Sequence, residues 1–277
     1  MNTPQFIPDP KAAWFQGGFV LRRYRVVSSK ITAPLRLVLL SDLHGTRYGR
    51  RQRYLLDAIA EAAPQAVLLA GDMLDEGTSD TPAWQLLKQL GERYPCFAVL
   101  GNHECRRESI LETQHLYRSC GITLLQGTGQ TLSFSGCPVH FCGVDSPARF
   151  GEGYFGHSYY FPLNFHLWRR QLSRCAARAP KGVFSVLLSH HPEHAAYYAA
   201  SGLNLTVCGH AHGGQVRIPG LVNGLYAPGQ GVLPPYAGGL YSLTPHSALA
   251  VSRGLVRNLL PRPGNPPEMA VIQLTGK

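Results

Sequence analysis

Five short runs of apolar residues punctuate the chain, and each ends in polar residues. The runs are Leu35–Leu40, Ala66–Ala70, Cys96–Leu100, Val183–Ser189 and Leu203–Cys208. Apolar runs of this length, bounded by turn residues, are typical of buried strands. Between the first three runs, apolar residues at helical spacing predict helices at Arg50–Ala63 and Pro82–Leu90. Strands that alternate with helices indicate α/β architecture.

The remaining pattern adds antiparallel strands to this plan. Short alternating segments occur between Thr131 and Val144, and again after Gln215, without helices between them. We therefore predict mixed sheets in a single domain over residues 31–277. Residues 1–30 are predicted to form a separate N-terminal arm, which is made basic by Arg22, Arg23, Arg25 and Lys30.

The polar residues at the strand ends are of types that bind metal ions. They comprise two carboxylates, one amide and four imidazoles: Asp42, His44, Asp72, Asn102, His190, His210 and His212. Ligands in α/β folds gather at the carboxyl ends of strands. Oxygen and imidazole ligands without thiolates suit manganese, iron or zinc. Seven ligands exceed one site, which indicates a pair of ions bridged by a carboxylate.

Each of these residues alone has an ordinary structural explanation. An Asp after a strand is commonly a turn residue or helix cap, and Asn102 alone would be assigned to a turn. Their coincidence at successive strand ends is not explained in this way. Asp42, Asp72 and Asn102 are spaced at thirty-residue intervals, the length of a βα unit. In Asp42-x-His44, as in the later His-x-His pair, residues i and i+2 of an extended chain face the same side.

These motifs, in this order, resemble those of the calcineurin-like metallophosphoesterases. The order is Asp-x-His, Gly-Asp, Gly-Asn-His-Glu, a later His and Gly-His-x-His, and the resemblance extends from about Pro34 to Leu274. It implies an α/β fold in which two mixed β-sheets pack as a sandwich flanked by helices. Three further segments resemble a bacterial branch of often membrane-associated phosphodiesterases, some of which act on UDP-2,3-diacylglucosamine: Gly209–Gln215, Val251–Gly254 and Pro267-Glu268.

The resemblance implies two divalent metal ions, with manganese favoured over iron and zinc, and it assigns the ligands. The first ion would be held by Asp42, His44 and His212, the second by Asn102, His190 and His210, and both by Asp72 as the bridge. We prefer His190 to His191 because it directly follows the strand Val183–Ser189.

The implied reaction is hydrolysis of a phosphodiester or pyrophosphate bond by metal-activated hydroxide. His103 is the expected catalytic residue, either stabilising the transition state or protonating the leaving group, because an imidazole titrates near neutral pH. The expected substrate is a small phosphate ester that is nucleotide-linked or lipid-linked. A phosphomonoesterase or phosphoprotein phosphatase, and a catalytically silent scaffold of the same fold, are the alternatives.

Charge narrows the choice of partner. The net charge of +10, from 26 Lys and Arg against 16 Asp and Glu, favours anionic partners. Nucleic acid is disfavoured because no long basic stripe is interleaved with stacking aromatics. A predicted amphipathic helix at Asn164–Arg178 either packs on the core, which we favour, or contacts an anionic membrane together with the basic arm. The aromatic segment 146–162 is either a lid or a cluster packed onto the domain.

Cysteine usage and the N-terminus indicate the compartment. Seven cysteines, never spaced Cys-x-x-Cys, argue against a disulfide framework and against a cysteine-based zinc site. The N-terminal sequence lacks a signal-peptide pattern, and no apolar stretch approaches the roughly 18 residues that a membrane span needs. We expect a cytoplasmic protein without an obligate protein partner, and peripheral contact with the inner membrane stays open.

Overall fold

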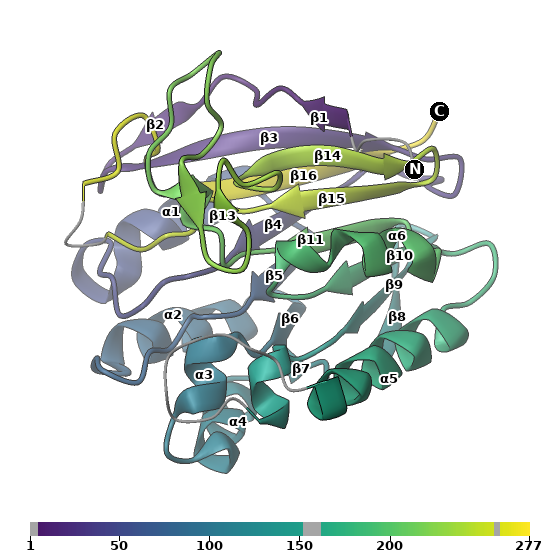
Figure 1. Ribbon diagram of the computed structural model, residues 1–277, viewed down its shortest axis with the longest axis horizontal. Coiled ribbons are helices and arrows are strands. Elements are labelled where there is room, and N and C mark those ends of the chain that lie inside the picture. The colour runs from purple at the N-terminus through teal and green to yellow at the C-terminus, as the bar shows by residue number, and fades with distance from the viewer. Residues whose placement is uncertain (1–4, 152–161, 258–260) are drawn as a thin grey trace.

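Two seven-stranded β-sheets pack face to face in the computed structural model, which describes residues 5–151, 162–257 and 261–277 (Figure 1). The first sheet has the order β1 (Gln5–Ile7), β14 (Gly239–Thr244), β15 (Ser247–Val251), β11 (Leu205–Cys208), β10 (Phe184–Leu188), β9 (Cys137–Gly143) and β8 (Thr128–Phe134). The second has the order β2 (Ala13–Phe15), β3 (Phe19–Val27), β16 (Glu268–Thr275), β4 (Leu35–Leu40), β5 (Ala66–Ala70), β6 (Cys96–Val99) and β7 (Thr123–Leu124).

Helices flank this sandwich. They are α1 (Arg53–Ala62), α2 (Thr81–Gly91), α3 (Asn102–Arg106), α4 (Ile110–Ser119), α5 (Pro162–Arg178) and α6 (Ala195–Ser201). The described residues also contain four 3₁₀ turns: η1 (Arg50–Gln52), η2 (Pro147–Phe150), η3 (Pro192–His194) and η4 (His212–Gly214). A separate two-stranded hairpin joins β12 (Tyr226–Ala227) to β13 (Gly231–Val232). The predicted sandwich with flanking helices is therefore confirmed.

Both sheets are mixed, as the sequence predicts. Parallel pairs run through β4–β5–β6–β7 in one sheet and through β9–β10–β11–β15 in the other. Antiparallel pairs join β8 to β9 and β14 to β15. The carboxyl ends of parallel neighbours lie at the same edge of a sheet, so the residues that follow them are brought together.

Alternation along each strand separates three layers of the core. Leu37 and Leu39 of β4 pack between the two sheets, whereas Val38 and Leu40 pack against α1 and α2. In the other sheet, Val186 of β10 lies in the core between the sheets, and the next residue, Leu187, faces α5. Strands buried on both faces in this way appear in the sequence as continuous apolar runs.

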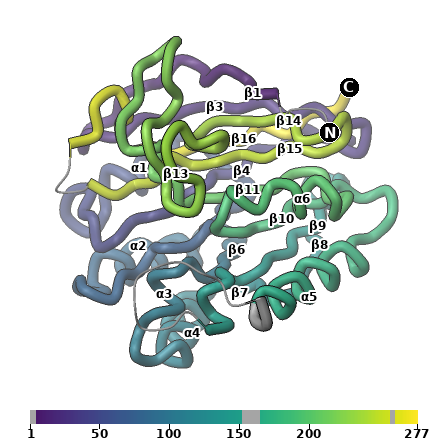
Figure 2. The backbone as a smooth tube through the Cα atoms, viewed as in Figure 1, coloured from purple at the N-terminus to yellow at the C-terminus, as the bar shows by residue number. Residues whose placement is uncertain are grey.

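The prediction of a separate N-terminal arm over residues 1–30 is wrong for most of that range, because β3 is a full member of the second sheet. It pairs in parallel with β16, from Val20 opposite Glu268 to Val27 opposite Thr275. Figure 2 shows these purple and yellow segments side by side. Arg22 is buried, and its Nε atom lies 2.9 Å from Oε2 of Glu268. Part of the positive charge that was expected on a free arm is thus paired with a carboxylate inside the fold.

Helix α5 packs its apolar face on the first sheet, which is the alternative that the sequence favours. Trp168, Leu172 and Cys175 are buried there. Across the described ranges, no helix combines the length and apolar character needed to cross a bilayer. Of the aromatic segment 146–162, residues 152–161 lie outside the described residues, so the lid prediction stays a prediction.

Candidate metal centre

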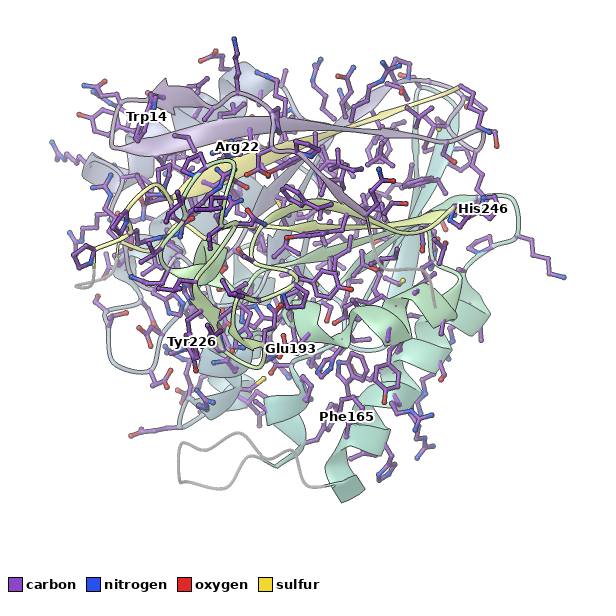
Figure 3. All side chains as sticks on the ribbon, turned by 45° about the horizontal axis from the view of Figure 1, so that its top comes forward. Trp14, Arg22, Phe165, Glu193, Tyr226 and His246 are labelled. Atoms are coloured by element: carbon purple, nitrogen blue, oxygen red, sulfur yellow. The ribbon has the colours of Figure 1, made fainter. Side chains whose placement is uncertain are left out.

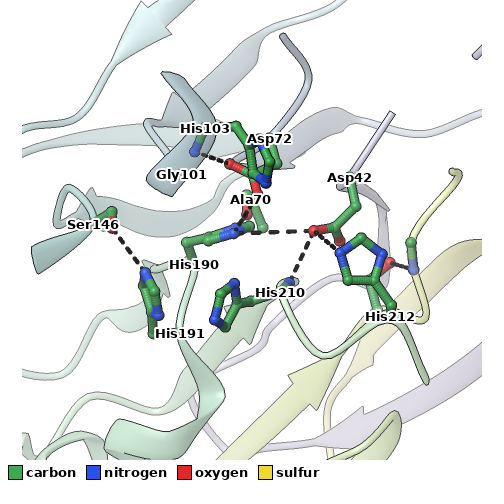
Figure 4. A network of polar contacts seen from close by, with 12 residues as sticks. Asp42, Ala70, Asp72, Gly101, His103, Ser146, His190, His191, His210 and His212 are labelled. Atoms are coloured by element: carbon green, nitrogen blue, oxygen red, sulfur yellow. Dashed lines mark hydrogen bonds and ion pairs between the residues drawn. The ribbon is translucent and has the colours of Figure 1, made fainter. Parts of the chain in front are cut away.

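The polar residues identified from the sequence converge at one edge of the sandwich (Figure 4). Asp42, Asp72 and Asn102 follow β4, β5 and β6, which are parallel neighbours in one sheet. His190 and His210 follow β10 and β11, a parallel pair in the facing sheet. The centre is therefore built from both sheets.

Among the described residues, two adjoining groups of ligand-type atoms are made up of the predicted ligands. Atoms of Asp42, His44 and His212 lie within 4.8 Å of one another, and so do atoms of Asp72, His190 and His210. Two contacts join the groups: Nε2 of His44 lies 3.8 Å from Oδ2 of Asp72, and Nε2 of His190 lies 4.0 Å from Oδ1 of Asp42. Asp72 is therefore within reach of both groups, as expected of a bridging carboxylate.

Six of these residues carry a buried side-chain atom without a hydrogen-bond partner. The atoms are Asp42 Oδ2, His44 Nε2, Asp72 Oδ2, Asn102 Oδ1, His190 Nε2 and His212 Nδ1, of which Asp72 Oδ2 and His190 Nε2 face each other as an ion pair. Burying a polar atom without a partner costs free energy, and native folds rarely accept six such atoms in one place. Carboxylate, amide and imidazole donors are the ligands that manganese, iron and zinc accept. The residues present therefore fit divalent cations.

Hydrogen bonds to the protein orient the imidazoles and carboxylates. Nδ1 of His190 donates to the carbonyl oxygen of Ala70 at 2.7 Å, so Nε2 is the nitrogen that is directed toward the carboxylates and that a cation would take after losing its proton. Oδ1 of Asp42 accepts the backbone N–H of His210 at 3.0 Å, and Oδ1 of Asp72 accepts that of His103 at 2.9 Å. In each carboxylate the second oxygen is the one left without a partner.

The backbone of the centre is strained. Five of the seven candidate ligands adopt left-handed conformations, with φ between 44° and 66°: Asp42, His44, Asp72, His210 and His212. Such conformations are uncommon outside glycine and concentrate at functional sites. Close packing adds a further constraint, since a Cβ on Gly101 would lie 2.1 Å from Oδ1 of Asp72. The chain there has room only for glycine.

Glu104 fixes the loop that carries Asp72, a role that sequence reasoning did not assign. Its Oε2 accepts the backbone N–H groups of Asp72 and Gly101 at 2.7 and 2.9 Å. Its Oε1 accepts those of Met73 and Leu74 at 2.7 and 3.0 Å, and the Tyr117 hydroxyl at 2.8 Å. The Gly-Asn-His-Glu motif contained the signal, because its last residue is an acid in the first turn of the short helix that follows β6.

Asp75 and Glu76 were also missed, although they lie beside the expected catalytic residue. Nδ1 of His103 lies 2.7 Å from Oε2 of Glu76 and 3.0 Å from Oδ1 of Asp75. The other oxygen of Asp75 lies 3.6 Å from Nδ1 of His44. The imidazole of His44, and then that of His103, lower the pKa of Asp75. Asp75 is therefore an ionised carboxylate that faces both rings.

The two neighbouring histidines His190 and His191 differ in their surroundings. His191 donates from Nδ1 to Oε1 of Glu193 at 2.9 Å, and its Nε2 is hydrogen-bonded to Oγ of Ser146 at 2.8 Å. Burial keeps the pKa of His191 well below its ordinary value, so the ring is neutral. Both of its nitrogens thus contact protein groups, whereas Nε2 of His190 faces Asp72. This difference favours His190 as the ligand.

Comparison with known proteins places the chain in a family. Residues 35–214 match the family model of the calcineurin-like phosphoesterases, and the chain belongs to that family. It is therefore a metal-dependent phosphoric ester hydrolase, consistent with the donor atoms gathered at the strand ends.

Individual relatives agree with this assignment. The chain is 29% identical over 222 residues to phosphodiesterase YaeI of Escherichia coli, covering 76% of this chain and 73% of the relative. It is 27% identical over 236 residues to the uncharacterized metallophosphoesterase YkuE of Bacillus subtilis, covering 82% and 73%. The crystal structure of TT1561 of Thermus thermophilus superposes with a TM-score of 0.53 at 13% identity, covering 80% of this chain and 90% of that one. This last likeness concerns the fold alone.

Proposed function

We propose that this chain hydrolyses a phosphodiester or pyrophosphate bond at a pair of divalent metal ions, with manganese favoured. The observation that carries the proposal is the pair of adjoining ligand groups that meet at Asp72, each with buried atoms lacking a partner. Asp42, His44 and His212 would hold one ion, and Asn102, His190 and His210 the other, with Asp72 shared. Two ions so placed supply charge neutralisation of the phosphoryl group and a water of lowered pKa.

The protein contributes orientation and a proton. Asp75 and Glu76 both face Nδ1 of His103, which fixes the proton on that nitrogen and leaves Nε2 for the substrate. The ring of His103 lies edge-on to that of His44, with centroids 4.5 Å apart, so it borders one ligand group. From this position His103 stabilises charge on the phosphoryl oxygens or protonates the leaving group.

The proposal includes a preference for diesters over monoesters. It is supported by the relative in Escherichia coli, which is named a phosphodiesterase. We propose a nucleotide-linked or lipid-linked small molecule as the substrate, because the net charge of +10 favours anionic compounds. Nucleic acid and an obligate protein partner are not part of the proposal.

The test is hydrolysis of bis(para-nitrophenyl) phosphate by metal-stripped protein, before and after addition of manganese. The monoester para-nitrophenyl phosphate is assayed in parallel, and His190→Ala serves as the matched variant with one ligand removed. Manganese-restored cleavage that favours the diester would support the proposal. A preference for the monoester would indicate the phosphomonoesterase alternative. Folded protein that binds two manganese ions and cleaves neither compound would indicate a silent scaffold.

A further inference from the structure

We propose that the loop of residues 216–233, which we call the apolar loop, inserts into an anionic phospholipid bilayer. The proposal deepens the proposed function, because it names the surface at which a lipid-linked substrate would be met. Six of the thirteen exposed large apolar residues of the described chain fall in this loop: Ile218, Leu221, Leu225, Tyr226, Val232 and Leu233. Leu221 and Val232 are 79% and 71% exposed. Such a concentration marks an interaction surface.

Part of the backbone of the apolar loop is paired within the loop itself. At its tip, Ile218 and Val222 exchange N–H to carbonyl hydrogen bonds at 2.9 and 2.8 Å, and the N–H of Leu221 also donates to Ile218 at 3.0 Å. Its second arm contains the hairpin β12–β13, in which Tyr226 pairs with Val232. Backbone groups left unpaired in hydrocarbon cost several kcal/mol each, so internal pairing is a requirement for insertion.

The apolar loop is also held rigidly on the core. The N–H of Leu225 donates to the carbonyl of Gly214 at 2.8 Å, and the N–H of Leu233 donates to that of Leu225 at 2.8 Å. Oδ1 of Asn223 accepts from Nη2 of the buried Arg253 at 2.6 Å. A loop fixed this firmly does not bury its apolar side chains by folding back, so their exposure is built in.

The apolar loop adjoins the metal centre. It follows η4, whose first residue is the candidate ligand His212. Its hairpin packs on Glu193, since a Cβ on Gly229 would lie 2.5 Å from Oε1 of that residue. Figure 3 shows Tyr226 of the hairpin and Glu193 on the same side of the molecule. A loop seated in a bilayer would therefore present the metal centre to lipid-linked phosphate esters.

Charge favours an anionic bilayer as the partner. The chain contains no Asp or Glu between Glu193 and Glu268, so the apolar loop carries no acidic side chain. Together with the net charge of +10, this removes the repulsion that an anionic lipid surface would otherwise meet. Apolar insertion combined with electrostatic attraction is how peripheral proteins bind such surfaces. The two elements that the sequence suggested for this role, α5 and the arm, are packed into the fold.

The experiment is co-sedimentation of the metal-loaded protein with vesicles of phosphatidylglycerol and phosphatidylethanolamine, compared with vesicles of phosphatidylcholine. Three proteins are compared: wild type, the double variant Leu221→Asp with Val232→Asp, and Leu111→Asp. Leu111 on α4 is 73% exposed and is the matched control outside the apolar loop. We expect wild type and Leu111→Asp to bind the anionic vesicles, and the double variant to bind at least about tenfold more weakly.

A fluorescent variant tests insertion directly. Tryptophan emission of Leu221→Trp should shift to shorter wavelength with anionic vesicles and be quenched by brominated lipids. The proposal would be overturned if wild type did not bind anionic vesicles at low salt. It would also be overturned if the double variant and Leu111→Asp lost vesicle binding equally. The proposal would also be overturned if wild type formed a dimer and bound no vesicles, and if the double variant abolished that dimer. All variants should cleave the soluble diester like wild type, so failure of the membrane proposal is distinguishable from failure of the proposed function.

Discussion

Nε2 of His190 lies 2.9 Å from Oδ2 of Asp72, and both side chains are buried. Burial disfavours a charged imidazole, but the carboxylates of Asp72 and Asp42 outweigh it and raise the pKa of His190 to about 10. Burial would likewise raise the pKa of Asp72, yet His190 and then His44 hold it well below its ordinary value. Without metal, the two residues therefore form an ion pair at neutral pH, and a proton occupies a place that suits a cation.

Metal affinity should therefore rise with pH. The proton must leave His190, and also His44, whose pKa is raised to about 9 by Asp75 and Asp72 against the opposing effect of burial. Both imidazoles are protonated below these values in the metal-free protein, so lowering the pH favours the proton over the cation. Each displaced proton should change the apparent manganese affinity by about tenfold per pH unit. Chelator competition at about pH 6 and about pH 8 measures this slope, and a flat profile would contradict it.

Substitution of His190 and His191 in turn should show which of the two binds metal and which only supports the fold. His190→Ala removes a group whose Nε2 faces both carboxylates, so we expect metal content to fall by about one ion per chain. His191→Ala should retain both ions and lower the free energy of unfolding by about 1–3 kcal/mol, because Ser146 and Glu193 lose a buried partner. Elemental analysis and urea unfolding distinguish these outcomes. Loss of metal in His191→Ala alone would reverse the assignment.

The convergence of the candidate ligands could be predicted from the sequence because it depends on local features. Asp42, Asp72 and His190 each lie two residues beyond the end of a strand, and parallel strands bring their carboxyl ends to one edge regardless of the rest of the chain. The helices predicted at Arg50–Ala63 and Pro82–Leu90 are present, as Arg53–Ala62 and Thr81–Gly91, because they too depend on local features. Their apolar residues recur at helical spacing, and Pro64 limits the first of them.

Other features depend on contacts between distant parts of the chain. The pairing of β3 with β16 joins the two ends of the sequence. From the sequence alone Arg22 is expected to be a surface charge, whereas in the fold it is paired with Glu268. Asp75 and Glu193 resemble ordinary loop acids for the same reason, because only the fold brings them to His103 and His191. Residue type and spacing predict the candidate ligands of the centre, whereas its supporting hydrogen bonds require the structure.

His103→Ala should retain both metal ions and lose most turnover. The side chain contacts Asp75 and Glu76 and is 29% exposed, so its removal leaves the ligand groups in place. We expect kcat for the soluble diester to fall by about 100-fold or more, as is usual when a positioned acid is removed. His115→Ala, an exposed histidine on α4, is the matched control and should have wild-type activity. Parallel loss of bound metal in His103→Ala would instead assign a ligand role.

Glu104→Gln should destabilise the metal centre through its backbone. Each carboxylate oxygen accepts at least two donors, and four of the five are the backbone N–H groups of Asp72, Met73, Leu74 and Gly101. Whichever way the glutamine amide turns, its NH₂ group faces at least two of these buried donors. We expect the free energy of unfolding to fall by about 3 kcal/mol, because each unsatisfied buried donor costs about 1–3 kcal/mol.

The same substitution should weaken manganese binding, because Asp72 and Asn102 are carried by the loops that Glu104 joins. Tyr117→Phe is the matched control: it removes one donor, leaves the carboxylate intact and should cost about 1 kcal/mol with unchanged metal affinity. Urea unfolding of the metal-stripped variants separates loss of backbone support from loss of metal. If Glu104→Gln unfolded like Tyr117→Phe and bound manganese like wild type, the buried carboxylate would not be what positions Asp72.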